Sequence, residues 1–307
     1  FIEKCLKDIS LAEPLLKDFD TEYHPSAMHT NMSTGSSTNW SARNRFDSRM
    51  QIDEMGEFFW YRGWRMNYLA VLALKARVCL YAGDMYKIMA KSAAKEIYDV
   101  YYLKDSWVGF TGSENITCQP DIRYYKLFDD VLYSNDNSVK YPLANIETLF
   151  ASDNIGVYSD YRLLYQLKTS NTSSQAYFTG KYSVSADGVV SACENPMVPL
   201  FRLSEICYIL AEIAAGENNI SEGVEYLSAV RKARGALRDI SLSVTTPEQL
   251  MDEIILDARK DLMCEGQMFF MYKRLNIEMV PSASRPGFNK NMREGYVIPI
   301  PTSESPF

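Results

Sequence analysis

Two glutamates in an apolar stretch are the simplest candidates for acid–base chemistry in this chain of 307 residues. Glu205 and Glu212 lie seven residues apart, a spacing that places both side chains on one face of a helix. Glycoside hydrolases use two carboxylates, but many helices carry two acids on one face without any catalytic role. The sequence has no GxSxG, P-loop, HExxH or GxGxxG motif. A helical glycoside hydrolase is therefore the least favoured of three functional hypotheses.

Two polar segments contain groups that could bind a metal. His24 and His29 are the only histidines and lie five residues apart, and the run SNDNS at 134–138 offers the oxygen ligands that calcium takes. That run lacks the glycine and the terminal glutamate of an EF-hand loop. The six cysteines form no CxxC pair, so the usual spacing of a zinc site is missing. We expect no cofactor, with calcium as the weaker alternative.

Aromatic rings beside amide, carboxylate or guanidinium groups form the pattern that best matches a function. A sugar presents an apolar C–H face and a rim of hydroxyls, so its site needs a ring for stacking and polar groups for hydrogen bonds. Three segments combine both, the last of them beside Asp160 and Arg162. Their candidate binding residues are Asn39, Trp40 and Arg43, then Asp105 and Trp107, then Tyr158 and Tyr161. For each ring, the alternative is that it anchors a long loop on the scaffold.

The composition excludes other classes of protein. Aromatic residues make up 13% of the chain, more than a core of this size needs, which favours exposed rings. The net charge is −7 and no Lys/Arg cluster is dense enough to follow a phosphate backbone, so we expect no nucleic-acid partner. Apolar stretches such as 69–74 are far shorter than the roughly 20 residues of a membrane span. Cys79, Cys207 and Cys264 lie in apolar helical runs, where we expect free, buried thiols.

Helical periodicity predicts the scaffold that must position these groups. Apolar residues recur every three or four positions over 1–19, and paired runs of the same kind over 63–98 and 199–235 each predict a helical hairpin. In the first hairpin, Gly83 suits the left-handed position that ends a helix, and Asp84 suits the N-cap of the next helix. One long helix is expected over 247–275, with Pro247 in its first turn, followed by a tail over 276–307.

Two long segments, 20–50 and 101–195, lack sustained helical periodicity and are rich in polar residues and aromatic rings. Loops of this length within a compact domain are usually functional or disordered, and binding groups concentrate in them. The predicted fold class is therefore mostly α, with degenerate tetratricopeptide-like helical hairpins and long loop-rich insertions. In this arrangement the helices form the scaffold and the insertions bind the ligand.

Five sequence motifs follow one another in a characteristic order. Residues 63–84 read GWRMNYLAVLALKARVCLYAGD, residues 199–216 read PLFRLSEICYILAEIAAG, and residues 230–235 read VRKARG. Residues 257–274 then read DARKDLMCEGQMFFMYKR and residues 296–301 read YVIPIP, followed by Glu304. Asp160-x-Arg162 and Lys181-Tyr182 stand between the first two motifs. In this order the chain resembles the SusD/RagB-like nutrient-binding proteins of Bacteroidetes.

The resemblance implies a fold and a function. Residues 1–307 would form a single SusD-like domain, the C-terminal portion of the family's chain, and the family's N-terminal portion with its lipidated cysteine would precede Phe1. The protein would be a lipid-anchored protein of the outer-membrane surface that binds glycan, glycopeptide or peptide in a site built from loops. It would deliver this ligand to a SusC-like TonB-dependent transporter without catalysing a reaction. The remaining hypothesis is a protein-interaction scaffold whose helical repeats bind a peptide or helix.

The resemblance also assigns structural roles to charged residues within apolar stretches. Arg202, Glu205, Arg259 and Glu265 are expected to fix the fold through buried Arg–Glu pairs rather than to contact ligand. Where the family's last helix usually has Arg and, three residues later, Asp, this chain has Met268 and Met271. Because both polar members are replaced together, we expect repacking of that helix rather than loss of the fold.

Overall fold

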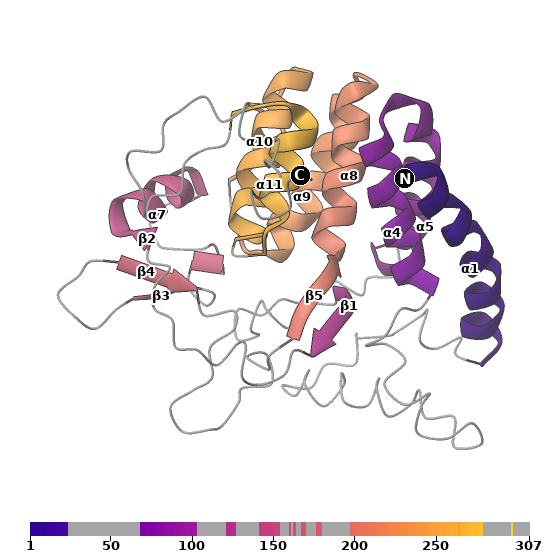
Figure 1. Cartoon of the computed structure of the whole chain (residues 1–307). Coiled ribbons are helices and arrows are strands. Elements are labelled where there is room, and N and C mark those ends of the chain that lie inside the picture. The colour runs from indigo at the N-terminus through magenta and orange to yellow at the C-terminus, as the bar shows by residue number, and fades with distance from the viewer. Residues whose placement is uncertain are drawn as a thin grey trace, which may run out of the picture.

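The computed structural model of the chain is mostly helical, which confirms the predicted fold class (Figure 1). Most of the long polar segment predicted over 20–50 lies outside the residues that the structure describes. The described residues are 1–23, 68–102, 121–126, 141–153, 160, 162–163, 167–169, 176–179, 197–236, 238–263, 265–278 and 296.

The first hairpin consists of α4 (Tyr68–Ala82) and α5 (Lys87–Tyr102), joined through Gly83 and the short 3-10 helix η4 (Asp84–Tyr86). The opening helix α1 (Ile2–Tyr23) packs against α4. Gly83 adopts φ 91° and ψ −164°, a conformation that favours glycine, and it is itself the N-cap of η4. The prediction of Asp84 as an N-cap is therefore wrong. Its carboxylate pairs with Lys87 instead.

The second hairpin consists of α8 (Leu203–Gly216) and α9 (Ile220–Ala233). The turn between them places Asn218 at φ 57°, and the Asn219 side chain caps α9 by accepting a hydrogen bond from the Glu222 N–H. Helix α8 buries residues on all sides, as expected of a helix at the centre of a core. Cys207 in α8 and Cys79 in α4 are buried free thiols, as predicted.

The predicted single helix over 247–275 is wrong, because two helices occupy this range. Helix α10 (Pro247–Asp261) begins with Thr246 and Gln249 in a capping box and with Pro247 in its first turn. Helix α11 (Gln267–Leu275) follows Gly266, which adopts a left-handed conformation with φ 73°. The apolar periodicity continues through the break, but this glycine turns the backbone out of the helical path.

The described part of the 101–195 insertion contains regular structure. Strand β1 (Asp121–Lys126) pairs antiparallel with β5 (Met197–Arg202), which leads directly into α8. A second sheet has the order β2-β4-β3, formed by Tyr141–Pro142, Ala176–Thr179 and Leu167–Thr169. Helix α7 (Leu143–Phe150) and the 3-10 turn η6 (Ala151–Asp153) follow β2. The insertion is therefore less irregular than its sequence suggests.

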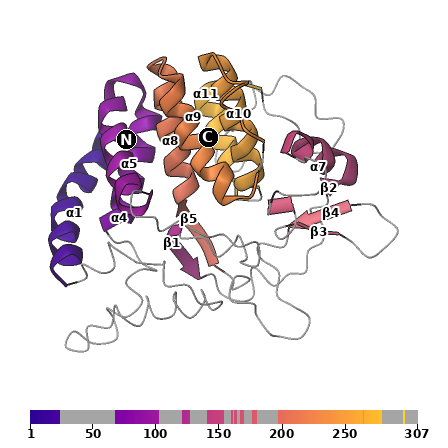
Figure 2. The ribbon, with the colours of Figure 1, turned by 180° about the vertical axis from the view of Figure 1, so that it is seen from behind.

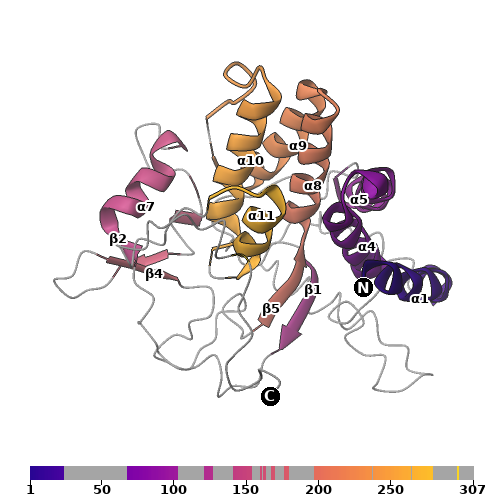
Figure 3. The same ribbon diagram turned by 45° about the horizontal axis from the view of Figure 1, so that its top comes forward.

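The helices stand side by side in sequence order, from α1 through α4–α5 and α8–α9 to α10–α11 (Figures 1 and 2). Helix α8 contacts α5 on one side and α10 on the other, so it joins the two halves of the row. The strands lie at one end of the helices, and α7 lies beyond α10 (Figure 3). Within the described ranges, no helix has the length and the hydropathy required to cross a membrane.

The α8–α9 crossing yields a prediction about glycine. A Cβ on Gly223 in α9 would lie 2.4 Å from Leu250 Cδ2 and 3.3 Å from the Ala211 carbonyl oxygen. Leu250 is fully buried, so the core must shift to admit the methyl group. We expect Gly223→Ala to lower the free energy of unfolding by about 1–2 kcal/mol, despite the better helix propensity of alanine. Urea unfolding followed by circular dichroism measures this change.

Gly216→Ala is the matched control, because a Cβ there would meet only Lys87 Nζ, at 3.5 Å. This variant should differ from the parent protein by less than about 0.5 kcal/mol or be slightly more stable. Equal stability of the two variants would contradict the close packing of α9 on α8.

Candidate functional site

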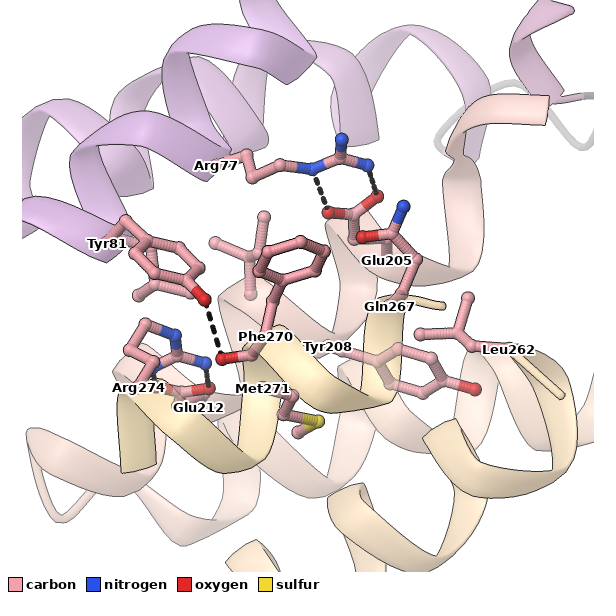
Figure 4. Close-up of a pocket in the computed structure, with 12 residues that line it drawn as sticks. Arg77, Tyr81, Glu205, Tyr208, Glu212, Leu262, Gln267, Phe270, Met271 and Arg274 are labelled. Carbon is pink, nitrogen blue, oxygen red and sulfur yellow. Dashed lines mark hydrogen bonds and ion pairs between the residues drawn. The ribbon is translucent and has the colours of Figure 1, made fainter. Parts of the chain in front are cut away.

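A cavity of about 280 Å³ lies between α4, α8 and α11 (Figure 4). Its polar lining residues are Arg77, Tyr81, Glu205, Glu212, Gln267 and Arg274. Its apolar lining consists of Leu80, Tyr208, Ile209, Leu262, Phe270 and Met271. The seven-residue spacing of Glu205 and Glu212 does place both on one face of α8, and that face forms a wall of the cavity.

Each of these two glutamates is held by an arginine from a neighbouring helix (Figure 4). Arg77 on α4 donates two hydrogen bonds of 2.6 Å to the two carboxylate oxygens of Glu205. Arg274 on α11 binds Glu212 in the same bidentate way, and its Nη2 lies 2.6 Å from Glu212 Oε2. Such pairs occupy the carboxylate oxygens that a catalytic acid or base would need. Neither glutamate is therefore positioned for proton transfer to a substrate.

The surroundings keep the Arg77 side chain charged and fixed in orientation. Burial alone would lower its pKa, but the adjacent Glu205 carboxylate outweighs burial and raises the pKa above its ordinary value. The guanidinium also lies 4.3 Å from the centre of the Phe201 ring, a cation–π distance. The pair between α4 and α8 is thus a structural link, as the resemblance implies for Glu205.

Two aromatic rings form the exposed side of the cavity. The Tyr81 hydroxyl donates a hydrogen bond of 2.7 Å to the carbonyl oxygen of Phe270, and the two rings meet edge to face with centroids 6.5 Å apart. Tyr81 is 38% and Phe270 50% exposed. The sequence analysis did not select either residue, because each lies in a helix whose apolar pattern predicts a buried ring. The contact between Tyr81 and Phe270, which lie far apart in the sequence, is the feature that distinguishes them from other aromatic residues of these helices.

A second group of polar residues lies entirely inside the protein, around Arg162. Its guanidinium binds both carboxylate oxygens of Asp160, at 2.9 and 2.7 Å, and also Asp257 Oδ1 on α10, at 2.9 Å. All three side chains are at most 1% exposed. Asp160 and Arg162 were grouped with the sugar-binding candidates Tyr158 and Tyr161. The structure corrects this grouping, because both charged groups are buried against α10 and bonded within the protein.

Further buried charges extend this cluster, which we call the buried ionic network. Its four aspartates are matched by three arginines and one lysine, and the exposed fraction of each charged side chain is at most 2%. Arg234 Nε lies 2.6 Å from Asp261 Oδ1, while Arg231 and Lys260 both bind Asp153. The members are Asp153, Asp160, Arg162, Arg231, Arg234, Asp257, Lys260 and Asp261. The network joins the insertion to α9 and α10.

The positive groups of the network lower the pKa of Asp153, Asp257 and Asp261. Burial alone would raise the pKa of Asp153, but Lys260 and Arg231 together lower it to about 2. For Asp257 and Asp261 burial is again outweighed, chiefly by Arg162 and Arg234 respectively, and the pKa of each carboxyl lies below its ordinary value.

Tyr208 on α8 connects the cavity with the buried ionic network. Its side chain lines the cavity, and its hydroxyl donates a hydrogen bond of 3.0 Å to Asp257 Oδ2. Burial, followed by the nearby Asp257 and Asp261 carboxylates, raises the pKa of this hydroxyl well above its ordinary value. Tyr208 is therefore a neutral donor that fixes one wall of the cavity.

An ion pair between Arg202 and Glu265 confirms the structural role expected of both residues. Arg202, at the end of β5, places Nη2 at 2.6 Å from Glu265 Oε1, and both side chains are less than 10% exposed. Met268 and Met271 pack against the main core, which confirms the repacking expected at these positions. Arg259 is partly exposed, and no ion pair of its side chain is seen in the described residues.

Comparison with known proteins agrees with this arrangement of motif residues. The model of the SusD family matches residues 28–304. The chain belongs to the SusD family. Resemblance to SusD/RagB-like proteins, inferred from the ordered motifs, is thereby confirmed. Comparison with curated proteins finds no match.

Solved structures of SusD superfamily proteins share the fold at low sequence identity. One from Bacteroides thetaiotaomicron VPI-5482 has a TM-score of 0.52 and 20% identity, over 78% of this chain and 55% of that one. One from Bacteroides vulgatus ATCC 8482 has a TM-score of 0.55 and 17% identity, over 80% and 57% of the two chains. A third, from Bacteroides fragilis NCTC 9343, has a TM-score of 0.50 and 15% identity, over 81% and 61%. This SusD-family chain thus spans a little over half the length of these relatives.

The sugar-binding residues predicted for this SusD-family chain lie outside the described residues. They are Asn39, Trp40, Arg43, Asp105, Trp107, Tyr158 and Tyr161. His24, His29 and the possible calcium ligands at 134–138 also lie outside them. Within the described ranges, no three His, Cys, Asp or Glu side chains are grouped closely enough to hold a metal ion.

From the buried ionic network we predict that removal of a buried charge lowers the free energy of unfolding more than removal of an exposed charge. Arg162→Met leaves Asp160 and Asp257 buried without their main partner, so we expect the free energy of unfolding to fall by about 3–5 kcal/mol. Lys91→Met removes a similar ion pair to Glu217, at 2.6 Å, but with side chains 31% and 48% exposed. This control should lose less than about 1 kcal/mol. Denaturant titration of both variants checks the difference, and similar losses would contradict a structural role for Arg162.

The lowered pKa values predict a loss of stability in acid. A carboxyl whose pKa is lower in the folded than in the unfolded state stabilises the fold above its unfolded pKa, and this stability disappears as the pH falls through the folded pKa. For Asp153, a shift from 3.8 to about 2 corresponds to about 2 kcal/mol, lost between about pH 5 and pH 2.

Unfolding free energies from urea titrations at pH 7, 5, 3.5 and 2.5 measure this loss. Asp153→Asn should be less stable than the parent protein at pH 7 and depend less on pH in the acid range. A parent protein equally stable at pH 7 and pH 2.5 would contradict the pairing of Asp153 with Lys260 and Arg231.

Proposed function

We propose that the protein is a non-catalytic binding protein that captures glycan at the cell surface and delivers it to a SusC-like TonB-dependent transporter. The observation that carries this proposal is the family match over residues 28–304. The ordered motifs within that match build the helical scaffold and its ion pairs. A lipid anchor would hold this scaffold at the outer membrane.

The geometry of the carboxylates supports binding over hydrolysis. Glu205 and Glu212 are the candidates for a catalytic pair, and both are engaged by arginines in bidentate hydrogen bonds. An inverting or retaining glycosidase needs one carboxylic acid and one free carboxylate that face a common substrate. The described scaffold offers no such pair at this site, so the enzyme hypothesis loses its candidate residues.

Glycan binding would come from the loop segments, through the rings of Trp40, Trp107 and Tyr158 and the polar groups near them. Stacking on an aromatic ring suits the apolar face of a sugar, and neighbouring amide, carboxylate and guanidinium groups suit its hydroxyls. The polar groups described in the scaffold are instead largely bonded to one another. This difference supports a division between a structural scaffold and binding loops.

A glycan screen followed by substitution of these rings tests the proposal. We expect the protein to be retarded in native gels that contain a recognised polysaccharide. Each of Trp40→Ala, Trp107→Ala and Tyr158→Ala should weaken this binding about tenfold if its ring stacks on the sugar. Tyr81→Ala removes an aromatic ring from the helical scaffold and serves as the matched control, with unchanged binding. No retardation by any glycan would count against the proposal.

The same samples separate the competing hypotheses. A protein-interaction scaffold would keep its ligand in the three ring variants and lose it in a helix-face variant such as Ile88→Ala, whose side chain is 85% exposed. A hydrolase would release reducing sugar, and this activity would disappear in Glu205→Gln. We expect neither result, and we expect a TonB-dependent transporter to co-purify from solubilised outer membranes.

A further inference from the structure

The cavity between α4, α8 and α11 has the chemistry of a site for an apolar ring. Leu80, Ile209, Leu262 and Met271 supply aliphatic walls, and Tyr81 and Phe270 supply two aromatic rings at its exposed side. Aromatic rings in proteins favour edge-to-face and offset contacts with other rings. The hydrogen bond from the Tyr81 hydroxyl to the Phe270 carbonyl oxygen ties the two sides of this opening together before any ligand arrives.

The charges around the cavity disfavour both ions and sugars. Arg77 is bonded to Glu205 and Arg274 to Glu212, so two positive and two negative groups balance. A charged ligand would have to break one of these bidentate pairs, at the cost of an uncompensated charge. A sugar would find the four charged groups of the lining already bonded to one another, and its hydroxyls would face the aliphatic walls. A ligand with one polar atom could instead bond the Gln267 amide, which also lines the cavity.

The volume limits the size of the ligand. The cavity measures about 280 Å³. An engineered protein cavity of about 150 Å³ binds a single benzene ring. A space almost twice as large suits two fused rings, and a longer chain of rings would exceed it.

We propose that this cavity, lined by α4, α8 and α11, binds a small, uncharged, planar compound of two fused aromatic rings. The ligand would insert between the Tyr81–Phe270 opening and the Ile209–Leu262 wall. This site goes beyond the proposed function and does not depend on it. Because Tyr208 belongs both to the wall and to the buried ionic network, ligand binding also stabilises the packing of α8 on α10.

Indole is the probe, since it has two fused rings, no charge and one N–H group. Isothermal titration and ligand-observed NMR of the whole chain should show saturable binding at one site. Indole-3-acetate and tryptamine, which carry a negative and a positive charge, should bind at least tenfold more weakly. Glycans recognised by the protein should not displace indole, which distinguishes failure of this proposal from failure of the proposed function.

Substitutions at the cavity locate the site. Met271→Trp fills the cavity from α11 and should abolish indole binding, and Gln267→Trp is a second filling variant in case the first does not fold. Phe270→Ala should weaken binding five- to tenfold through loss of one ring contact. Phe1→Ala is the matched control, because the Phe1 ring is fully exposed and does not line the cavity. This control should bind indole as the parent protein does.

Three outcomes would overturn the proposal. The first is absence of saturable indole binding, and the second is unchanged binding in a folded filling variant. The third is binding of a tryptophan-containing peptide without binding of free indole, which would assign the cavity to a side chain of a protein partner. Saturable indole binding that both a filling variant and Phe270→Ala reduce, while Phe1→Ala does not, supports the proposal.

Discussion

The guanidinium of Arg162 holds the inserted segment against the helical scaffold. It binds Asp160, two residues before it, and Asp257 on α10, and Asp257 in turn accepts a hydrogen bond from Tyr208 on α8. Because these charged groups are removed from water, loss of one partner would leave the other as an uncompensated buried charge. The placement of the insertion relative to α8 and α10 therefore depends on a complete set of bonds. Regular secondary structure alone would not fix it.

Charge pairing also determines what the face of α8 that carries Glu205 and Glu212 can do. The two arginine–glutamate pairs hold α4 and α11 to α8, and they occupy the carboxylates that otherwise resemble a catalytic pair. What remains between the pairs is an apolar cavity with aromatic rings at its opening. The same ion pairs thus engage both carboxylates and leave apolar space between them. Tyr208 links this cavity to the buried ionic network, since its side chain lines the cavity and its hydroxyl bonds Asp257.

The motif residues of this SusD-family chain bond within the scaffold. Asp160 bonds Arg162 locally, whereas Arg162 bonds Asp257 and Arg202 bonds Glu265 across long separations in sequence. The candidate glycan residues lie outside the described part of the chain, so their role stays a prediction.

The sequence by itself determined the helical fold class, the turn at Gly83 and the family, because helical periodicity and motif order are local properties that are read along one chain. It did not determine where α10 ends: the apolar pattern continues to Leu275, and only the left-handed backbone at Gly266 separates two helices. It also did not determine the partner of Glu205. Arg77 lies 128 residues away, and many acids and bases are available in between. Which charges pair, and hence whether α8 presents a catalytic pair or an apolar cavity, was decided only by the tertiary structure, because pairing depends on which helix faces meet in space.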